Sequence, residues 1–275
     1  MTEPQPYSPI YPPMLYLIYA TTDLPAPNTA RLVQHMPFFS SDAQDDPTLT
    51  WTQGSSHSGQ GSAVFIGHQL QMAGLAAPLP PGVIDRTVMV SPWGAQIKAA
   101  MRQHRAHISL VYAGQNPDPV EQMLALYALA GTFETEDLLG IVNPNAWNAH
   151  PPADFLSPAS LAQFRQEIPF NLWVGYVRFY TDDQSFWLVT KGHHVFDVPD
   201  LAYFIEPGQD PDAVITLFTN LFYYLYEDDV FVTAGDTLEI QGTGQQLQFS
   251  QVTEMIDDLM GPSGTLVITQ AESPD

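Results

Sequence analysis

The chain has 275 residues, of which 45% are apolar and 12% aromatic, enough to bury the core of one large domain or two modest ones. It contains no cysteine and no run of about 18 apolar residues, which excludes disulfides, thiolate metal sites, cysteine nucleophiles and a membrane-spanning helix. Its 30 acidic and 8 basic residues give a net charge of −22, which argues against nucleic-acid binding because that binding depends on Lys and Arg.

The start of the chain is rich in proline. Residues 1–13 hold five prolines and predict an extended leader. The apolar stretch that follows, 14–20, is short, and no Lys or Arg precedes it, which is unlike a secretory signal. We therefore expect a cytoplasmic protein.

The first half of the chain predicts a mixture of strands and helices. Residues 40–62 are rich in Ser, Gly, Asp and Gln and predict a mobile loop, with a short strand near 49–52 as an alternative. Before this loop we expect a strand at 14–19 and a short helix after Asn28. After it we expect a strand pair at 63–66 and 69–72, followed by a Pro-rich connection at 78–81. The remaining elements are a helix near Pro92 with Ser91 as its cap, a strand at 108–112 and a helix that Asp118 caps.

The second half begins after a Pro-, Asn- and Ala-rich stretch around 143–158, which predicts a boundary between two lobes, 14–150 and 151–275. The second lobe is expected to hold a helix at 159–167, a hairpin of 172–180 and 186–190, a strand at 201–206, a long apolar helix from Asp210, and strands at 237–240, 247–250 and 266–269. Strands cluster between helices instead of alternating with them, so the order predicts an α+β fold with mixed or antiparallel sheets packed with helices.

The negative charge is concentrated in the second half. Residues 1–133 have a net charge of −3, whereas 134–275 hold 22 acids and 3 bases, a net of −19. Such a surface would attract a basic protein partner and accelerate its association. The alternative is that the charge only keeps the protein soluble. The candidate partner-binding residues are the acids at expected turns and helix ends: Asp182, Asp183, Glu227, Asp228, Asp229, Asp257 and Asp258.

Familiar catalytic motifs are missing from the sequence. Neither lysine belongs to a Gly-Lys-Ser/Thr phosphate loop, the pattern around Gly59 and Gly61 lacks the third glycine of a dinucleotide fingerprint, and 54–58 lacks the last glycine of a nucleophile elbow. The sequence therefore predicts no catalytic residue and no cofactor.

Histidines are the remaining candidates for a ligand site. His104, His107, His193 and Asp197 could line a groove between the lobes or, together with His194, contribute to a metal site. The simpler interpretation is that these imidazoles satisfy backbone groups, and adjacent histidines on an extended chain point to opposite faces. We therefore predict no metal site.

Three patterns resemble one bacterial family. His104-Arg-Ala-His-Ile108 resembles its His-Lys-Ala-His-Ile/Val stretch, and 190–201 resembles its Thr-x-Gly … Phe-Gly-x-Pro-Glu-Leu signature. The Tyr-rich helix followed by Glu227-Asp-Asp-Val230 and Gly235-Asp-Thr237 also agrees. This family is catalogued as domain of unknown function 4261, and the resemblance covers about residues 88–240.

The resemblance implies an α+β bacterial protein without an assigned activity, and it supplies no catalytic residue. Asp197 stands where the family has glycine, and Asp200 stands where it has Glu. If that glycine position requires a positive φ, Asp adopts it at some cost.

Three functions stay open from the sequence. The first is a non-enzymatic partner-binding protein, of the immunity or inhibitor kind, that neutralises a basic toxin or effector through its acidic surface. The second is a structural or assembly subunit that pairs through sheet edges. The third is an enzyme or ligand-binding domain with a histidine-containing groove between the lobes. We favour the first because the acidic excess is large and the catalytic motifs are missing.

Overall fold

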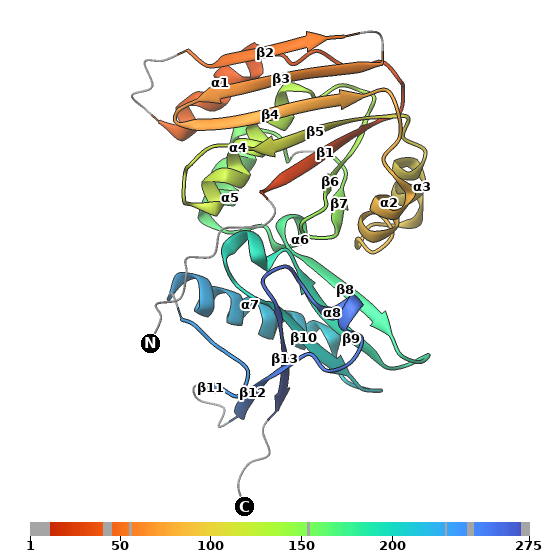
Figure 1. The fold of residues 1–275 in the computed structure, drawn as a ribbon, viewed down its shortest axis with the longest axis vertical. Coiled ribbons are helices and arrows are strands. Elements are labelled where there is room, and N and C mark those ends of the chain that lie inside the picture. The colour runs from red at the N-terminus through yellow and green to blue at the C-terminus, as the bar shows by residue number, and fades with distance from the viewer. Residues whose placement is uncertain are drawn as a thin grey trace, which may run out of the picture. The chain divides into compact units, whose positions relative to one another are not determined.

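The computed structural model describes residues 12–40, 46–54, 57–152, 155–228, 230–240 and 245–270 (Figure 1). They form two compact units, an N-terminal unit of residues 12–173 and a C-terminal unit of residues 174–270. Each unit consists of one largely antiparallel sheet packed with helices, which confirms the predicted α+β fold. Of the expected leader, residues 1–11 lie outside the described residues.

The N-terminal unit is built on a seven-stranded antiparallel sheet in the order β2-β3-β4-β5-β1-β6-β7. Its strands are β1 (Met14–Tyr19), β2 (Thr48–Gln53), β3 (Ser58–Phe65), β4 (His68–Leu75), β5 (Ala106–Tyr112), β6 (Leu138–Asn143) and β7 (Asn148–His150). The interior strand β1 is covered on both faces, which explains why almost every residue in it is apolar.

Six helices pack around this sheet. They are α1 (Thr29–Phe39), α2 (Pro81–Thr87), α3 (Ala95–Arg102), α4 (Pro119–Thr132), α5 (Pro158–Gln166) and α6 (Phe170–Trp173). Asp118 caps α4 as the sequence predicts, because its carboxylate accepts hydrogen bonds from the backbone N–H groups of Val120 and Glu121. Helix α4 packs against β1, β4 and β5 and also against α1 and α5, so that its whole second half is buried.

The prediction of a mobile loop over 40–62 is wrong for β2 and for the start of β3, and the alternative of a short strand near 49–52 is confirmed by β2. Gly59 and Gly61 lie inside β3, where a Cβ atom would collide with the ring of Trp51 and the carbonyl of Thr50. These glycines therefore permit close packing of neighbouring strands, a role that composition does not distinguish from flexibility. Residues 41–45 and 55–56 lie outside the described part of the chain.

The helix expected near Pro92 begins later. Helix α3 starts at Ala95 after Gly94, whereas the Ser91 hydroxyl donates to the carbonyl of Val88 at 2.8 Å. Ser91 is thus engaged with the end of α2, a helix that the sequence did not predict and that begins at Pro81, the last residue of the expected Pro-rich connection. Proline at the first position of α2 is compatible with a helix start.

The C-terminal unit contains a six-stranded sheet in the order β11-β12-β13-β10-β9-β8. Strands β10 and β13 pair in parallel, and the other pairs are antiparallel. The strands are β8 (Gly175–Tyr180), β9 (Phe186–Lys191), β10 (Asp200–Ile205), β11 (Thr237–Ile240), β12 (Gln245–Gln251) and β13 (Thr265–Gln270). A short 3-10 helix, η1 (His193–Phe196), connects β9 to β10, and α7 (Pro211–Glu227) and α8 (Ile256–Leu259) complete the unit.

Helix α7 packs along one face of this sheet (Figure 1). Its buried side chains, Phe218 and Leu221 among them, join a core with Leu188, Leu201 and Ile268. The long apolar helix expected from Asp210 is confirmed, and the structure fully buries mainly one side of it. Within the described residues, α7 is the longest helix at 17 residues, and no helix combines the length and apolarity needed to cross a bilayer.

The two units divide between Trp173 and Val174, later than the lobe boundary at 150/151 expected from the sequence. Helix α5 packs on α4, and the Asn148 side chain donates to the carbonyl of Asn171 at 2.6 Å, so residues 151–173 belong to the N-terminal unit. The Pro- and Asn-rich stretch therefore marks turns within one unit.

Candidate functional site

The surface of the C-terminal unit is strongly acidic. Among its described residues, thirteen carboxylates are exposed, against one exposed cation, Arg178. The other cation of the unit, Lys191, is buried. The exposed acids are Asp182, Asp183, Asp197, Glu206, Asp210, Asp212, Glu227, Asp228, Asp236, Glu239, Glu254, Asp257 and Asp258.

Six of the seven acids singled out from the sequence are exposed, and they lie on three elements. Asp182 and Asp183 occupy the turn between β8 and β9, Glu227 and Asp228 lie at the end of α7, and Asp257 and Asp258 lie on α8. Asp229 lies outside the described residues. Hydrogen bonds from the N–H groups of Gln184 and Ser185 hold the pKa of Asp182 below its ordinary value.

The sheet register brings further acids to the end that carries Asp182 and Asp183. Phe186 of β9 pairs with Tyr180 of β8 and with Ile205 of β10, so the turns that follow β8 and β10 lie at the same end of the sheet. The turn after β10 leads directly into α7. We name this group of five exposed carboxylates the acidic end: Asp182, Asp183, Glu206, Asp210 and Asp212.

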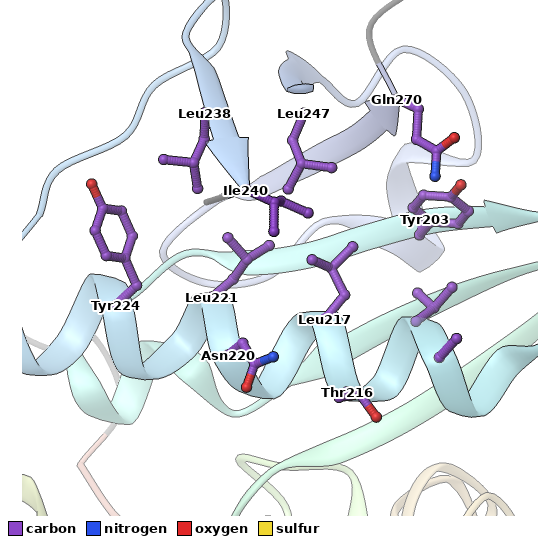
Figure 2. Close-up of a pocket in the computed structure, with 12 residues that line it drawn as sticks. Tyr203, Thr216, Leu217, Asn220, Leu221, Tyr224, Leu238, Ile240, Leu247 and Gln270 are labelled. Atoms are coloured by element: carbon purple, nitrogen blue, oxygen red, sulfur yellow. The ribbon is translucent and has the colours of Figure 1, made fainter. Parts of the chain in front are cut away.

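A groove of about 500 Å³ lies between α7 and the strands β11 and β12 (Figure 2). Leu217 and Leu221 of α7 face Leu238 and Ile240 of β11 in this view, with Leu247 of β12 beside them. Polar lining groups stand around the apolar centre and come from Tyr203, Thr216, Asn220, Tyr224 and Gln270. The half-exposed side of α7 is therefore one wall of a groove.

The two N-terminal histidines predicted for a ligand groove form hydrogen bonds with the backbone. The backbone N–H of Leu79 donates to Nε2 of His104 at 2.7 Å, so its Nδ1 carries the proton and donates to the carbonyl of Met101 at 2.8 Å. Nδ1 of His107 lies 2.8 Å from the carbonyl of Ala77. Burial lowers the pKa of both imidazoles and favours their neutral form.

His193 and Asp197 belong to the η1 connection of the C-terminal unit. Nδ1 of His193 donates to the carbonyl of Pro199 at 3.0 Å, and burial lowers the pKa of His193 to about 4. Asp197 is exposed and adopts φ 57°, the left-handed conformation that glycine adopts more readily. Partial burial raises the pKa of its carboxyl.

A buried polar cluster, which sequence reasoning missed, surrounds this connection. The carboxylate of Asp200 accepts from the Thr190 hydroxyl and from the backbone N–H of His193, and burial raises its pKa to about 7. The ammonium of Lys191 donates to the carbonyls of residues 258–260. Burial lowers the pKa of Lys191, although the nearby carboxylates of Asp200 and Asp258 oppose that shift. The cluster fixes the connection to α8.

The four candidate groove residues are divided between the units, with His104 and His107 in the first and His193 and Asp197 in the second. A shared groove between the units stays a prediction. Within the described ranges, no group of three or more His, Asp or Glu side chains is arranged to hold a metal ion. The hydrogen bonds of the three histidines favour a structural role for each of them.

The chain matches no family model, no curated protein and no solved structure. The resemblance to domain of unknown function 4261 therefore stays a prediction.

Proposed function

We propose that this chain is a non-enzymatic binding protein whose C-terminal unit docks a basic protein partner. The observation that carries the proposal is the ratio of thirteen exposed carboxylates to one exposed cation in the described part of that unit. Burial of Lys191 contributes to this ratio, because it removes a positive charge from the surface. A surface of one sign attracts a partner of the opposite sign and steers its approach.

An immunity or inhibitor role fits this chemistry. A protein that neutralises a basic toxin or effector needs a complementary surface and no reactive group of its own. The imidazoles of His104, His107 and His193 support this choice, because each is buried and hydrogen bonded to the backbone. Recognition of nucleic acid is disfavoured by the same acidic surface.

The test is affinity capture by the full chain from the native host at about 50 mM and about 500 mM salt, since exposed charges are screened at high salt. One variant replaces the five carboxylates of the acidic end with their amides, which preserves the turn of Asp182 and the cap of Asp210. A control variant makes the same change in charge on the N-terminal unit, at the exposed residues Asp23, Asp46, Asp85, Glu136 and Glu167.

We expect wild type and control to enrich the same basic protein at low salt and to release it at high salt. The variant of the acidic end should retain about tenfold less of it, a loss near 1.4 kcal/mol. Equal retention by both variants, or capture of no basic protein, would contradict the proposal.

A second candidate, an assembly subunit, is favoured by the edge strands β8 and β11. Each pairs with one neighbour in the described sheet, and an edge strand offers backbone groups to another chain. Sedimentation of the purified full chain distinguishes the two functions. A stable homo-oligomer would favour assembly, and a monomer that captures a basic partner would favour docking.

A further inference from the structure

The groove between α7 and β11–β12 borders three carboxylates of the acidic end, and this arrangement points to one kind of occupant. We infer that the groove binds an amphipathic, basic segment of the partner, with its apolar side chains between the two walls and its Lys or Arg side chains at the carboxylates. The inference rests on the proposed function and deepens it, because it assigns the docking position.

The apolar walls come from two elements whose periodicities match. On β11, Leu238 and Ile240 alternate with the exposed Thr237 and Glu239, so both apolar side chains lie on the face toward α7. On α7, Leu217 and Leu221 are four residues apart and lie on one side of the helix. Leu217 and both β11 side chains are only partly buried, so a ligand in the groove would cover apolar surface.

Three carboxylates of the acidic end, those of Glu206, Asp210 and Asp212, lie at one mouth of this groove. The turn of Asp182 and Asp183 follows β8, at the opposite edge of the sheet from β11. The lining of α7 begins at Ala213, directly after Asp212, whose side chain is exposed. Tyr203 of β10 and Gln270 of β13 line the same end of the groove. The two strands are parallel, and continuing their register places residue 270 beside Ile205. Glu206 and Asp210 follow Ile205 in the connection to α7, and both are exposed.

The length of the groove suits a short helix or strand. Its lining on α7 runs from Ala213 to Tyr224, which at 1.5 Å per residue is about 16 Å. Three turns of helix have this length, and an amphipathic helix in an apolar groove is a recurrent way to recognise a peptide. The volume lies within the range of about 300–1,000 Å³ that ligand sites occupy.

The charge selects among possible occupants. A second copy of the chain would bring another acidic C-terminal unit to the acidic end, and like charges across an interface oppose binding. An acidic or neutral apolar segment would leave the carboxylates without a partner. A segment with apolar residues on one side and basic residues on the other can pack against the apolar walls and also pair with the carboxylates at the mouth of the groove.

Two synthetic peptides of Leu and Lys test the inference with the full chain. Each has about 14 residues and the same composition, but only one places its leucines every three or four residues along one helical face. The scrambled peptide reports attraction to the acidic surface alone, and the amphipathic peptide also reports the groove. Fluorescence anisotropy at about 50 mM salt measures both affinities.

We expect wild type to bind the amphipathic peptide about tenfold more tightly than the scrambled one. Leu217→Gln combined with Leu238→Gln should reduce this preference to less than about twofold. Ile256→Gln is the matched control on the same unit, since its side chain is exposed on α8 and does not line the groove, and it should leave the preference unchanged. If the double variant does not fold, Asn220→Arg replaces it. Asn220 is an exposed residue of the groove lining, and this change should cause the same loss of preference for the amphipathic peptide without removing an apolar contact.

The outcomes separate the inference from the proposed function. Equal, salt-sensitive binding of both peptides, or a tenfold preference that survives Leu217→Gln/Leu238→Gln, overturns the groove assignment and leaves the acidic docking surface standing. No binding of either peptide at low salt overturns both. A homodimer that Leu217→Gln dissociates assigns the groove to a second copy and also overturns the inference.

Discussion

At the scale of single residues, Lys191 shows how the C-terminal unit compensates a buried charge. Its ammonium donates to the carbonyls of Asp258, Leu259 and Met260 at 2.9, 3.0 and 3.3 Å, and the side chain is 2% exposed. These bonds tie the end of β9 to the end of α8. A buried cation is tolerated only where such acceptors replace water.

Lys191→Met should therefore lower the free energy of unfolding by about 2–4 kcal/mol, because it leaves buried carbonyls without a donor. Lys98→Met is the matched control. Its ammonium makes an exposed hydrogen bond to the carbonyl of Met89, and the change should cost less than about 0.5 kcal/mol. Urea unfolding of the three proteins gives both values, and equal stability of the two variants would count against the role of Lys191.

Asp200 contributes to the free energy of unfolding in a way that depends on pH, and this contribution decreases as the pH rises, which is the opposite of the usual behaviour of a carboxylate. Burial raises its pKa from 3.8 to about 7, so between these values the folded state binds a proton that the unfolded state has released. Stability from this group is present below about pH 4 and is lost as the pH rises toward 7. The loss is at most about 4 kcal/mol.

Asp200→Asn removes this titration while retaining the acceptor for the N–H of His193. Relative to wild type, the variant should gain stability steadily from pH 4.5 to pH 7.5. Taking the difference between the two proteins cancels the other titrating groups. A difference in unfolding free energy that stays constant across this range would show that Asp200 is ionised throughout in the fold.

At the scale of elements, the β2–β3 pair depends on two glycines that resemble loop residues in composition. Gly61→Ala should cost about 1–3 kcal/mol, because the new methyl group would meet the carbonyl of Thr50. Gly82→Ala in α2, where a methyl group meets no neighbour, is the control in the same unit and should be neutral or slightly stabilising. Thermal unfolding of both variants measures the contrast, and a neutral Gly61→Ala would argue against a tight strand pair.

Elements with local signals could be predicted from the sequence. Helices α4 and α7 begin with an Asp cap and a proline, and β11, β12 and β13 have short apolar patterns, so their positions follow from neighbouring residues alone. The glycines of β3 could not be interpreted in this way, because what requires them is the ring of Trp51 and the backbone of Thr50 on another strand.

The candidate site was predictable only in part, for the same reason. Asp182 and Asp183 stand out as a pair in a turn, but Glu206, Asp210 and Asp212 join them only through the pairing of β9 with β10. The groove depends on which side of α7 faces β11, and the sequence of α7 is apolar around much of its circumference. Charge composition indicated which unit is acidic, and tertiary pairing defined which carboxylates lie together within that unit.

At the scale of the whole molecule, we expect buried histidines to make the fold sensitive to acid. Burial lowers the pKa of His68, His150, His193 and His194 from 6.5 to about 4. Between these values the unfolded chain binds protons that the folded chain does not, so stability is present above about pH 6.5 and is lost as the pH falls toward 4. One such histidine contributes about 3 kcal/mol to the free energy of unfolding above this range, and the titration of Asp200 changes stability in the opposite direction.

The free energy of unfolding should therefore decrease from pH 6.5 to pH 4.5, because several histidines outweigh the single carboxylate of Asp200. Urea midpoints at half-unit steps of pH measure the change. A urea midpoint that rises or stays constant as the pH falls from 6.5 to 4.5 would mean that the imidazoles are accessible to protons in the folded state.

The central claim is that the acidic end of the C-terminal unit steers and docks a basic protein, and association kinetics test it most directly. The captured partner, once purified, is mixed with the full chain across a range of salt concentrations, and the association rate constant is measured for wild type, the variant of the acidic end and the matched N-terminal control. We predict that the rate falls steeply with salt for wild type and control, and that removal of the five carboxylates lowers it about tenfold at low salt. Rates that are equal for both variants at every salt concentration would contradict the account.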